Sequence, residues 1–197
     1  VATWLFPERA RAGLAIPVAL ATLAVVGHLV GQVAFGWPAV VAGLAALAAG
    51  SYVTAGRTER DWRAYGEVGV VFTLAFVLIV AIRAVDPAAA PLPIATGEKF
   101  LDFGLLRTLD RSGSLPPEDM WFAGGRIKYY YGGHMLTALL ATLSGTAPRF
   151  AYNLALAGFF ATLVSGAYSL AGALVPEDVP RRVAAGFAAF FIGLAGN

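Results

Sequence analysis

The sequence predicts an all-α fold: a polytopic transmembrane helical bundle of about six spans, with an external loop that carries an amphipathic surface helix. Hydrophobic residues make up 58% of the 197 residues and charged residues only 13%, whereas soluble domains carry roughly 25% charged residues. The mean hydropathy is +0.71. Long apolar runs also alternate with polar breaks, as in proteins whose helices cross a bilayer.

A spanning helix needs about 20 apolar residues, and the runs that meet or approach this length define the expected spans. They are residues 12–35, 37–55, 67–85, 132–145, 150–175 and a last run that begins at 183. Gly36 and Pro38 predict a tight turn between the first two runs, which we expect to form a helical hairpin. The run at 132–145 is short, so we expect flanking residues to complete it.

The chain therefore has three expected parts. They are the N-terminal spans in 1–85, the external loop in 86–132 and further spans in 133–197. Arg57, Arg60 and Arg63 favour a cytoplasmic position for the break between the second and third spans, because cytoplasmic loops are enriched in basic residues. The long loop then lies on the outer face. The chain starts with Val and stops within an apolar run, so we expect it to be part of a longer polypeptide that supplies further helices.

Composition and motifs exclude several kinds of site. The formal net charge of +2 gives no support for nucleic-acid binding, and the absence of cysteine excludes disulfides and thiolate metal sites. The sequence has no glycine-rich phosphate loop, no residues at metal-ligand spacing and no Ser/His/Asp pattern. We predict no cofactor and no metal ligands, and leave open whether a divalent metal is needed.

The long loop contains a predicted helix from Gly97 or Glu98 to about Arg111. At about 100° per residue, Glu98 and Asp102 share one side of this helix with its leucines. These leucines are at positions 101, 105, 106 and 109. The like charges repel each other, and partial burial adds a desolvation penalty. The two carboxylates are therefore candidates for catalysis or ligand binding.

Structural explanations for both acids remain open. Glu98 lies in the first helical turn, where a negative charge interacts favourably with the helix dipole. Asp102 can form a salt bridge with Lys99, Arg126 or Lys128.

A second cluster precedes the span at 132–145. Arg126, Lys128, His134 and the hydroxyls of Tyr129, Tyr130 and Tyr131 can all donate hydrogen bonds to a phosphate. Trp121 and the tyrosine rings also suit a sugar or a prenyl chain. The alternative is an aromatic belt at the lipid headgroups.

Polar residues within the spans are weaker signals. His28 and Gln32 lie one turn apart and favour a hydrogen bond between helices over a ligand site. Asn153 can join helices or line a cavity, and Arg83 is expected to extend to the membrane interface.

The run from "GEKFLDFGLL" to "LPPEDMWFAGGRIKYYYGGH" resembles the signature of the prokaryotic "YYY" family of polytopic integral-membrane proteins, a domain of unknown function. The matches include Glu98, Lys99, Asp102, the Trp121-Phe122 pair and the tyrosine triplet with His134. Phe100 and Leu101 depart from the family's Pro-Met. The resemblance implies a multi-pass protein of the cell membrane.

The layout also resembles the C-type membrane glycosyltransferases, in which the first external loop supplies an essential acid. That resemblance implies transfer of a sugar from a polyprenyl-phosphate donor at the outer face, with Asp102 or Glu98 as the base. Lys99 and the aromatic and basic residues of the second cluster would bind the donor. The alternatives are a lipid-handling or transport protein without bond chemistry, and a non-catalytic scaffold.

Overall fold

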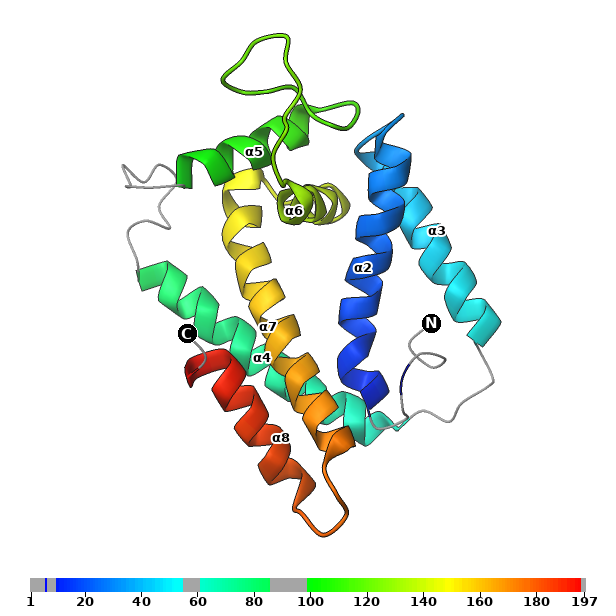
Figure 1. The fold of residues 1–197 in the computed structure, drawn as a ribbon, viewed down its shortest axis with the longest axis vertical. Coiled ribbons are helices and arrows are strands. Elements are labelled where there is room, and N and C mark those ends of the chain that lie inside the picture. Colours follow the sequence, from blue (N-terminus) through cyan, green and yellow to red (C-terminus); the bar gives the residue numbers. More distant parts are fainter. Residues whose placement is uncertain (1–5, 7–9, 55–60, 86–98, 196–197) are drawn as a thin grey trace. The chain divides into compact units, whose positions relative to one another are not determined.

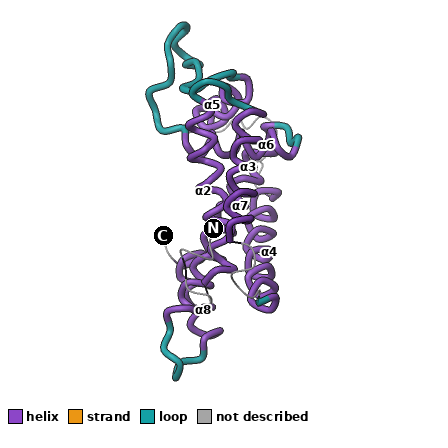
Figure 2. Tube along the Cα trace, turned by 90° about the vertical axis from the view of Figure 1, so that its right-hand side faces the viewer, coloured by secondary structure: helices purple, strands orange, loops and turns teal. Residues whose placement is uncertain are grey.

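The computed structural model describes residues 6, 10–54, 61–85 and 99–195, and this part of the chain contains helices and no strand (Figure 1; Figure 2). The predicted all-α class is confirmed. The elements are α2 (Arg11–Gly31), α3 (Trp37–Thr54), α4 (Trp62–Val85), α5 (Lys99–Arg111), α6 (Gly132–Ser144), α7 (Pro148–Leu174), α8 (Arg181–Phe190) and the π-helical turn η3 (Phe191–Ala195).

Within the described residues, four helices are long and apolar enough to cross a membrane: α2, α3, α4 and α7. The predicted count of about six spans is not confirmed, because α6 has 13 residues and α8 has 10, fewer than the roughly 20 that a span needs. Gly145 ends α6 in the left-handed conformation, with φ 67°, and its N–H bonds to the Ala141 carbonyl. Flanking residues do not lengthen α6, because α7 begins at Pro148.

Large apolar side chains on the long helices are exposed. Leu29, Val41 and Leu74 are 64%, 58% and 67% exposed. Extended apolar faces of this kind are unfavourable in water, but in a bilayer they contact lipid chains that are equally apolar. Together with the candidate spans, these faces identify the chain as a membrane protein.

Two helix starts follow from local chemistry. The carboxylate of Asp61 accepts the backbone N–H groups of Arg63 at 3.0 Å and Ala64 at 3.2 Å, so it caps α4. The helix therefore begins before the predicted span at 67–85. Gly36, with φ 85°, allows the sharp turn into α3 that the sequence predicts.

The chain divides into two compact units that do not follow sequence order. The first unit contains Val1–Ala19, Gly50–Ile82 and Leu156–Asn197, and the second contains Leu20–Ala49 and Arg83–Ala155. Both α2 and α7 contribute residues to each unit. The division that we expected at residues 85 and 132 stays a prediction.

The second unit has a core of large apolar side chains. Leu106 and Leu109 of α5 are fully buried together with Leu139 of α6 and Val40 of α3. Figure 1 shows α5 beside α6. A Cβ atom on Gly27 would lie 2.5 Å from Leu139 Cδ1, so the glycine lets α2 approach α6 closely.

The first unit instead joins its helices through small residues. Ala12 of α2 packs against Ala64 and Val68 of α4, and the Gly13 N–H donates to Ser169 Oγ of α7 at 3.2 Å. Small side chains let helices approach closely, which is how membrane helices associate.

Candidate functional site

α5 holds Asp102 on its buried side. Leu105, Leu106 and Leu109 are 1%, 0% and 0% exposed, and they pack this face of the helix into the second unit. Asp102 lies one turn before Leu106, so its side chain leaves the helix on the same side. The external amphipathic helix that the sequence predicts here stays a prediction.

Two side chains from other helices contact the Asp102 carboxylate. His134 Nε2 of α6 lies 3.2 Å from Oδ1, and the Tyr152 hydroxyl of α7 donates to Oδ2 at 3.2 Å. The side chains of Asp102 and His134 are 32% and 22% exposed. Asp102 is thus held on both oxygens while part of it remains accessible.

These contacts differ from the salt bridges considered from the sequence. Arg126 donates from Nη1 to the Pro116 carbonyl at 2.8 Å, and Lys128 lines a cleft that Asp102 does not line. The side chain of Lys99 and the whole of Glu98 lie outside the described residues. Their predicted roles stay predictions.

A hydrogen bond at the start of α7 lies next to this cluster. Arg83 Nε, near the end of α4, donates to Asn153 Oδ1 at 3.0 Å. Asn153 is adjacent in sequence to Tyr152, so a guanidinium group is fixed at the same end of α7 as the tyrosine. The sequence predicted separate roles for Arg83 and Asn153, and the structure joins them.

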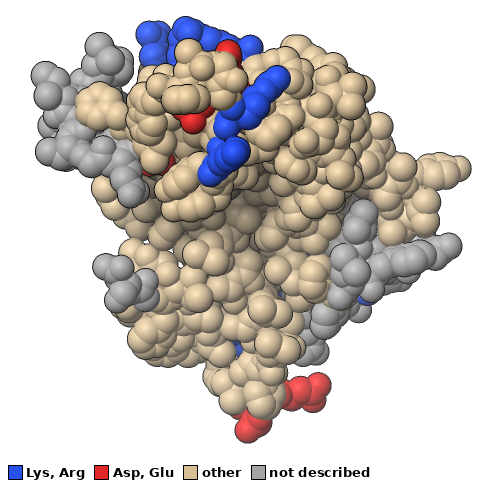
Figure 3. Space-filling model, turned by 45° about the horizontal axis from the view of Figure 1, so that its top comes forward, with Lys and Arg blue, Asp and Glu red and all other residues tan. Residues whose placement is uncertain are grey.

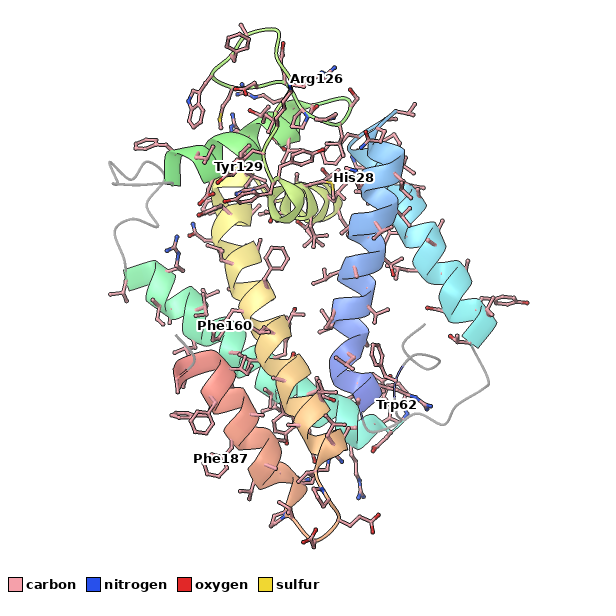
Figure 4. All side chains as sticks on the ribbon, viewed as in Figure 1. His28, Trp62, Arg126, Tyr129, Phe160 and Phe187 are labelled. Carbon is pink, nitrogen blue, oxygen red and sulfur yellow. The ribbon has the colours of Figure 1, made fainter. Side chains whose placement is uncertain are left out.

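The three consecutive tyrosines have different surroundings. The rings of Tyr129 and Tyr130 stack with centroids 4.0 Å apart, and their hydroxyls are 2.7 Å apart. Tyr131 packs against the core of the second unit, with its ring centroid 6.5 Å from that of His28. Burial raises the pKa of the Tyr131 hydroxyl, so this residue remains a neutral phenol. Figure 4 marks Tyr129 and His28.

His28 has a second contact. Gln32 Nε2 lies 3.2 Å from His28 Nε2 and also donates to the His28 carbonyl at 3.2 Å. The two residues predicted to join neighbouring helices therefore bond to each other along α2.

The loop between α5 and α6 folds over α5 (Figure 1). Its residues and those of α5 line two adjoining clefts. Asp119, Met120, Gly125 and Arg126 line both of them. One cleft also contains Trp121, Lys128 and Tyr129, which the sequence grouped as ligand-binding residues. Among the described residues, neither lining includes Asp102, His134 or Tyr152. Of the predicted site residues, Asp102 and His134 contact each other, whereas Trp121, Arg126, Lys128 and Tyr129 line the clefts. Tyr130 and Tyr131 line neither cleft.

A family model matches residues 19–197, and its description is "Uncharacterized membrane protein (DUF2298)". This match covers most of the chain. The chain belongs to this family. The sequence motif that contains the three tyrosines predicted a membrane family of unknown function, and this prediction is confirmed. No curated protein and no solved structure matches the chain.

Sequence reasoning missed Tyr152 in this DUF2298 chain. Tyr152 follows Phe150 and Ala151 near the start of an apolar run, where it resembles an interfacial aromatic residue. Its neighbour Asn153 was recognised as a polar residue in a span. The same reasoning applied to the Tyr152 hydroxyl would have identified it as a group that needs a partner.

Within the described residues, no group of three or more His, Cys, Asp or Glu side chains could hold a metal ion. The polar contacts of the Asp102 side chain with described residues are those to His134 and Tyr152. A carboxylate held by an imidazole and a phenol can accept a further proton through its remaining lone pairs, or can orient the imidazole toward a ligand.

Proposed function

We propose that this chain forms part of a multi-pass enzyme of the cell membrane, in which Asp102 is the general base for sugar transfer from a polyprenyl-phosphate donor at the outer face. The observation that carries the proposal is the fixed, partly accessible carboxylate. His134 and Tyr152 each lie 3.2 Å from one of its oxygens. A base must be positioned within hydrogen-bond reach of the proton that it removes, and these contacts fix its direction.

The proposed step removes the proton from an acceptor hydroxyl. That proton passes to the Asp102 carboxylate while the acceptor oxygen bonds to the anomeric carbon of the sugar. The bond from this carbon to the phosphate oxygen breaks, and polyprenyl phosphate leaves with the electron pair. His134 and Tyr152 act as positioning residues that hold the carboxylate. Because His134 contacts Asp102, we now assign it this role in place of phosphate binding.

Asp102→Asn tests the assignment, with Asp110→Asn as the matched control. Asp110 lies on the same helix and faces Arg107 at 4.0 Å, so its substitution removes the same charge at a different position. General base catalysis contributes about 10²–10⁴-fold, and we expect Asp102→Asn to lose at least about 100-fold of the transfer rate. The assay follows tritiated mannose or glucose from the polyprenyl phosphate to acceptors in membranes that contain the full polypeptide. Equal rates in the two variants would remove Asp102 from the mechanism.

The two clefts favour the alternative, a lipid-handling protein without bond chemistry, because Asp102 lines neither of them. That alternative predicts lipid binding without sugar transfer. Binding of polyprenyl phosphate that persists in Asp102→Asn, together with no transfer by the unsubstituted protein, would establish it.

A further inference from the structure

The polar cleft, which Arg107 and Arg111 line, lies on the side of α5 that faces away from Asp102. Arg107 and Arg111 follow Asp102 by five and nine positions, which places them about 140° and 180° around the helix. Met120 fixes the loop over this side, since a Cβ atom on Gly104 would lie 2.2 Å from Met120 Sδ. Gly104 therefore provides the space in which the loop contacts α5.

One of the clefts is polar and carries guanidinium groups. It has a volume of about 600 Å³, and its lining includes Arg107, Arg111 and Arg126 together with the acids Glu118 and Asp119. Figure 4 marks Arg126 on the loop beside α5, and Figure 3 shows basic side chains next to acidic ones on the face that carries this loop. Three of these charged side chains, those of Arg107, Asp119 and Arg126, already have partners. These partners limit how much of the charge can act on a ligand.

Asp119 stabilises the loop itself. Its Oδ1 accepts the backbone N–H groups of Trp121 at 2.8 Å and Phe122 at 3.1 Å. Arg107 faces Asp110 at 4.0 Å. Arg111, by contrast, makes no hydrogen bond or ion pair with any residue that the structure describes. Among the described residues, the Arg126 guanidinium bonds to the Pro116 carbonyl through Nη1 alone. Two arginines therefore retain donors that can bind an oxyanion.

The second cleft is mainly apolar. It has a volume of about 520 Å³, and Leu101, Leu105, Trp121, Phe122 and Tyr129 line it together with Lys128. It meets the polar cleft at Met120 and Arg126. Trp121 and Phe122 are 70% and 73% exposed at the tip of the loop, and such side chains are typical of the membrane interface. A guanidinium-lined cleft that adjoins an apolar one suits a molecule with an anionic head and a hydrocarbon chain.

We infer that these clefts bind an anionic phospholipid, with its phosphate between Arg111 and Arg126 and the start of its chain against Trp121 and Leu105. Arginine forms paired, charge-assisted hydrogen bonds with phosphate oxygens. The apolar cleft selects a lipid phosphate over free phosphate. This inference does not rest on the proposed sugar transfer, because Asp102, His134 and Tyr152 line neither cleft.

Binding of dioctanoyl phosphatidic acid to the purified chain in detergent tests this site. We expect the double substitution Arg111→Gln/Arg126→Gln to weaken binding by at least about tenfold, since hydrogen bonds to charged groups contribute this much or more. Arg149→Gln is the matched control, because Arg149 is an exposed arginine of α7 outside both clefts. Equal affinities in the double variant and the control would overturn the site.

Glu118→Gln provides a test that does not depend on a loss of function. Glu118 pairs through its backbone with Arg126 and lines the polar cleft, so its charge repels a bound phosphate. We expect Glu118→Gln to strengthen binding severalfold, because it removes the repulsion between two partly exposed negative charges. The effect is modest because water screens such charges. Weaker or unchanged binding in this variant would contradict the proposed position of the phosphate.

Two further ligands identify the source of the phosphate. Inorganic phosphate lacks the chain, and dioctanoylglycerol lacks the phosphate. We expect both to bind at least about tenfold more weakly than phosphatidic acid, because each loses the interactions of one cleft. Inorganic phosphate that binds as tightly as phosphatidic acid would overturn the assignment to a lipid.

Discussion

The two compact units of this chain use different kinds of packing. In the second unit, fully buried leucines of α5 and α6 form the core, as in a water-soluble protein. In the first unit, small residues of α2 bring it into close contact with α4 and α7, as in a membrane bundle. A smaller cluster around Ala75, Ala161 and Val164 packs α4 against α7. The candidate base and both clefts belong to the second unit. Both units contain parts of the candidate spans, but the second unit adds a core of large side chains and the polar residues of the candidate site.

The largest expected effect is on the leucine core. Leu109→Ala should lower the free energy of unfolding by about 2–5 kcal/mol, because it leaves a cavity among buried side chains. Leu109 is 0% exposed. Val164→Ala in the first unit removes fewer atoms and should have a smaller effect. Thermal unfolding of the purified variants in detergent measures both. A larger loss for Val164→Ala would contradict the described difference between the units.

The second-largest effect on stability is expected where α2 and α7 are in close contact in the first unit. A Cβ atom on Gly13 would lie 2.2 Å from Ser169 Cβ and 2.8 Å from the Ser165 carbonyl oxygen. Gly13→Ala should therefore destabilise the chain by about 1–3 kcal/mol through overpacking. Gly158→Ala on α7 is the control, because no atom other than the nearby backbone of α7 itself lies within 4 Å of the corresponding position. Equal unfolding midpoints for the two variants would show that α2 and α7 do not need this contact.

Tyr152→Phe should have a smaller effect on stability. It removes the hydroxyl that donates to Asp102 at 3.2 Å, and a hydrogen bond of this kind contributes about 1 kcal/mol. Tyr168→Phe on the same helix is the control, since the structure gives its hydroxyl no hydrogen bond with a described residue. If Tyr152→Phe is no less stable than Tyr168→Phe, the hydrogen bond to Asp102 contributes nothing to the fold.

The smallest effect is expected for an exposed ion pair in the first unit. Arg182 Nε donates to Glu67 Oε1 at 3.1 Å, and Nη2 contacts the same oxygen. The Arg182 side chain is 79% exposed, and exposed ion pairs contribute little to stability because water screens them. We expect Arg182→Gln to leave the unfolding midpoint unchanged. A clear decrease would mean that this pair fixes α8 against α4.

The helices could largely be predicted from the sequence, because apolar runs and turn residues act locally. The spacing of the leucines in α5 also predicted which side of this helix is buried, and that Asp102 lies on that side. The partners of Asp102 did not follow, because His134 and Tyr152 approach it from helices that are distant in sequence. The basic loop residues were assigned to the same site as Asp102, since sequence spacing alone does not show which side of α5 the loop covers. Gly104 and Met120 determine that side through packing.

The most direct test of the central claim is a double-mutant cycle on sugar transfer with Asp102→Asn and His134→Gln. If His134 acts by holding the Asp102 carboxylate, the double variant should be no slower than Asp102→Asn alone, because residues that act as one unit are strongly non-additive. If the two losses multiply, the positioning role of His134 is contradicted. If Asp102→Asn transfers sugar at the rate of the unsubstituted protein, the role of Asp102 as the base is contradicted.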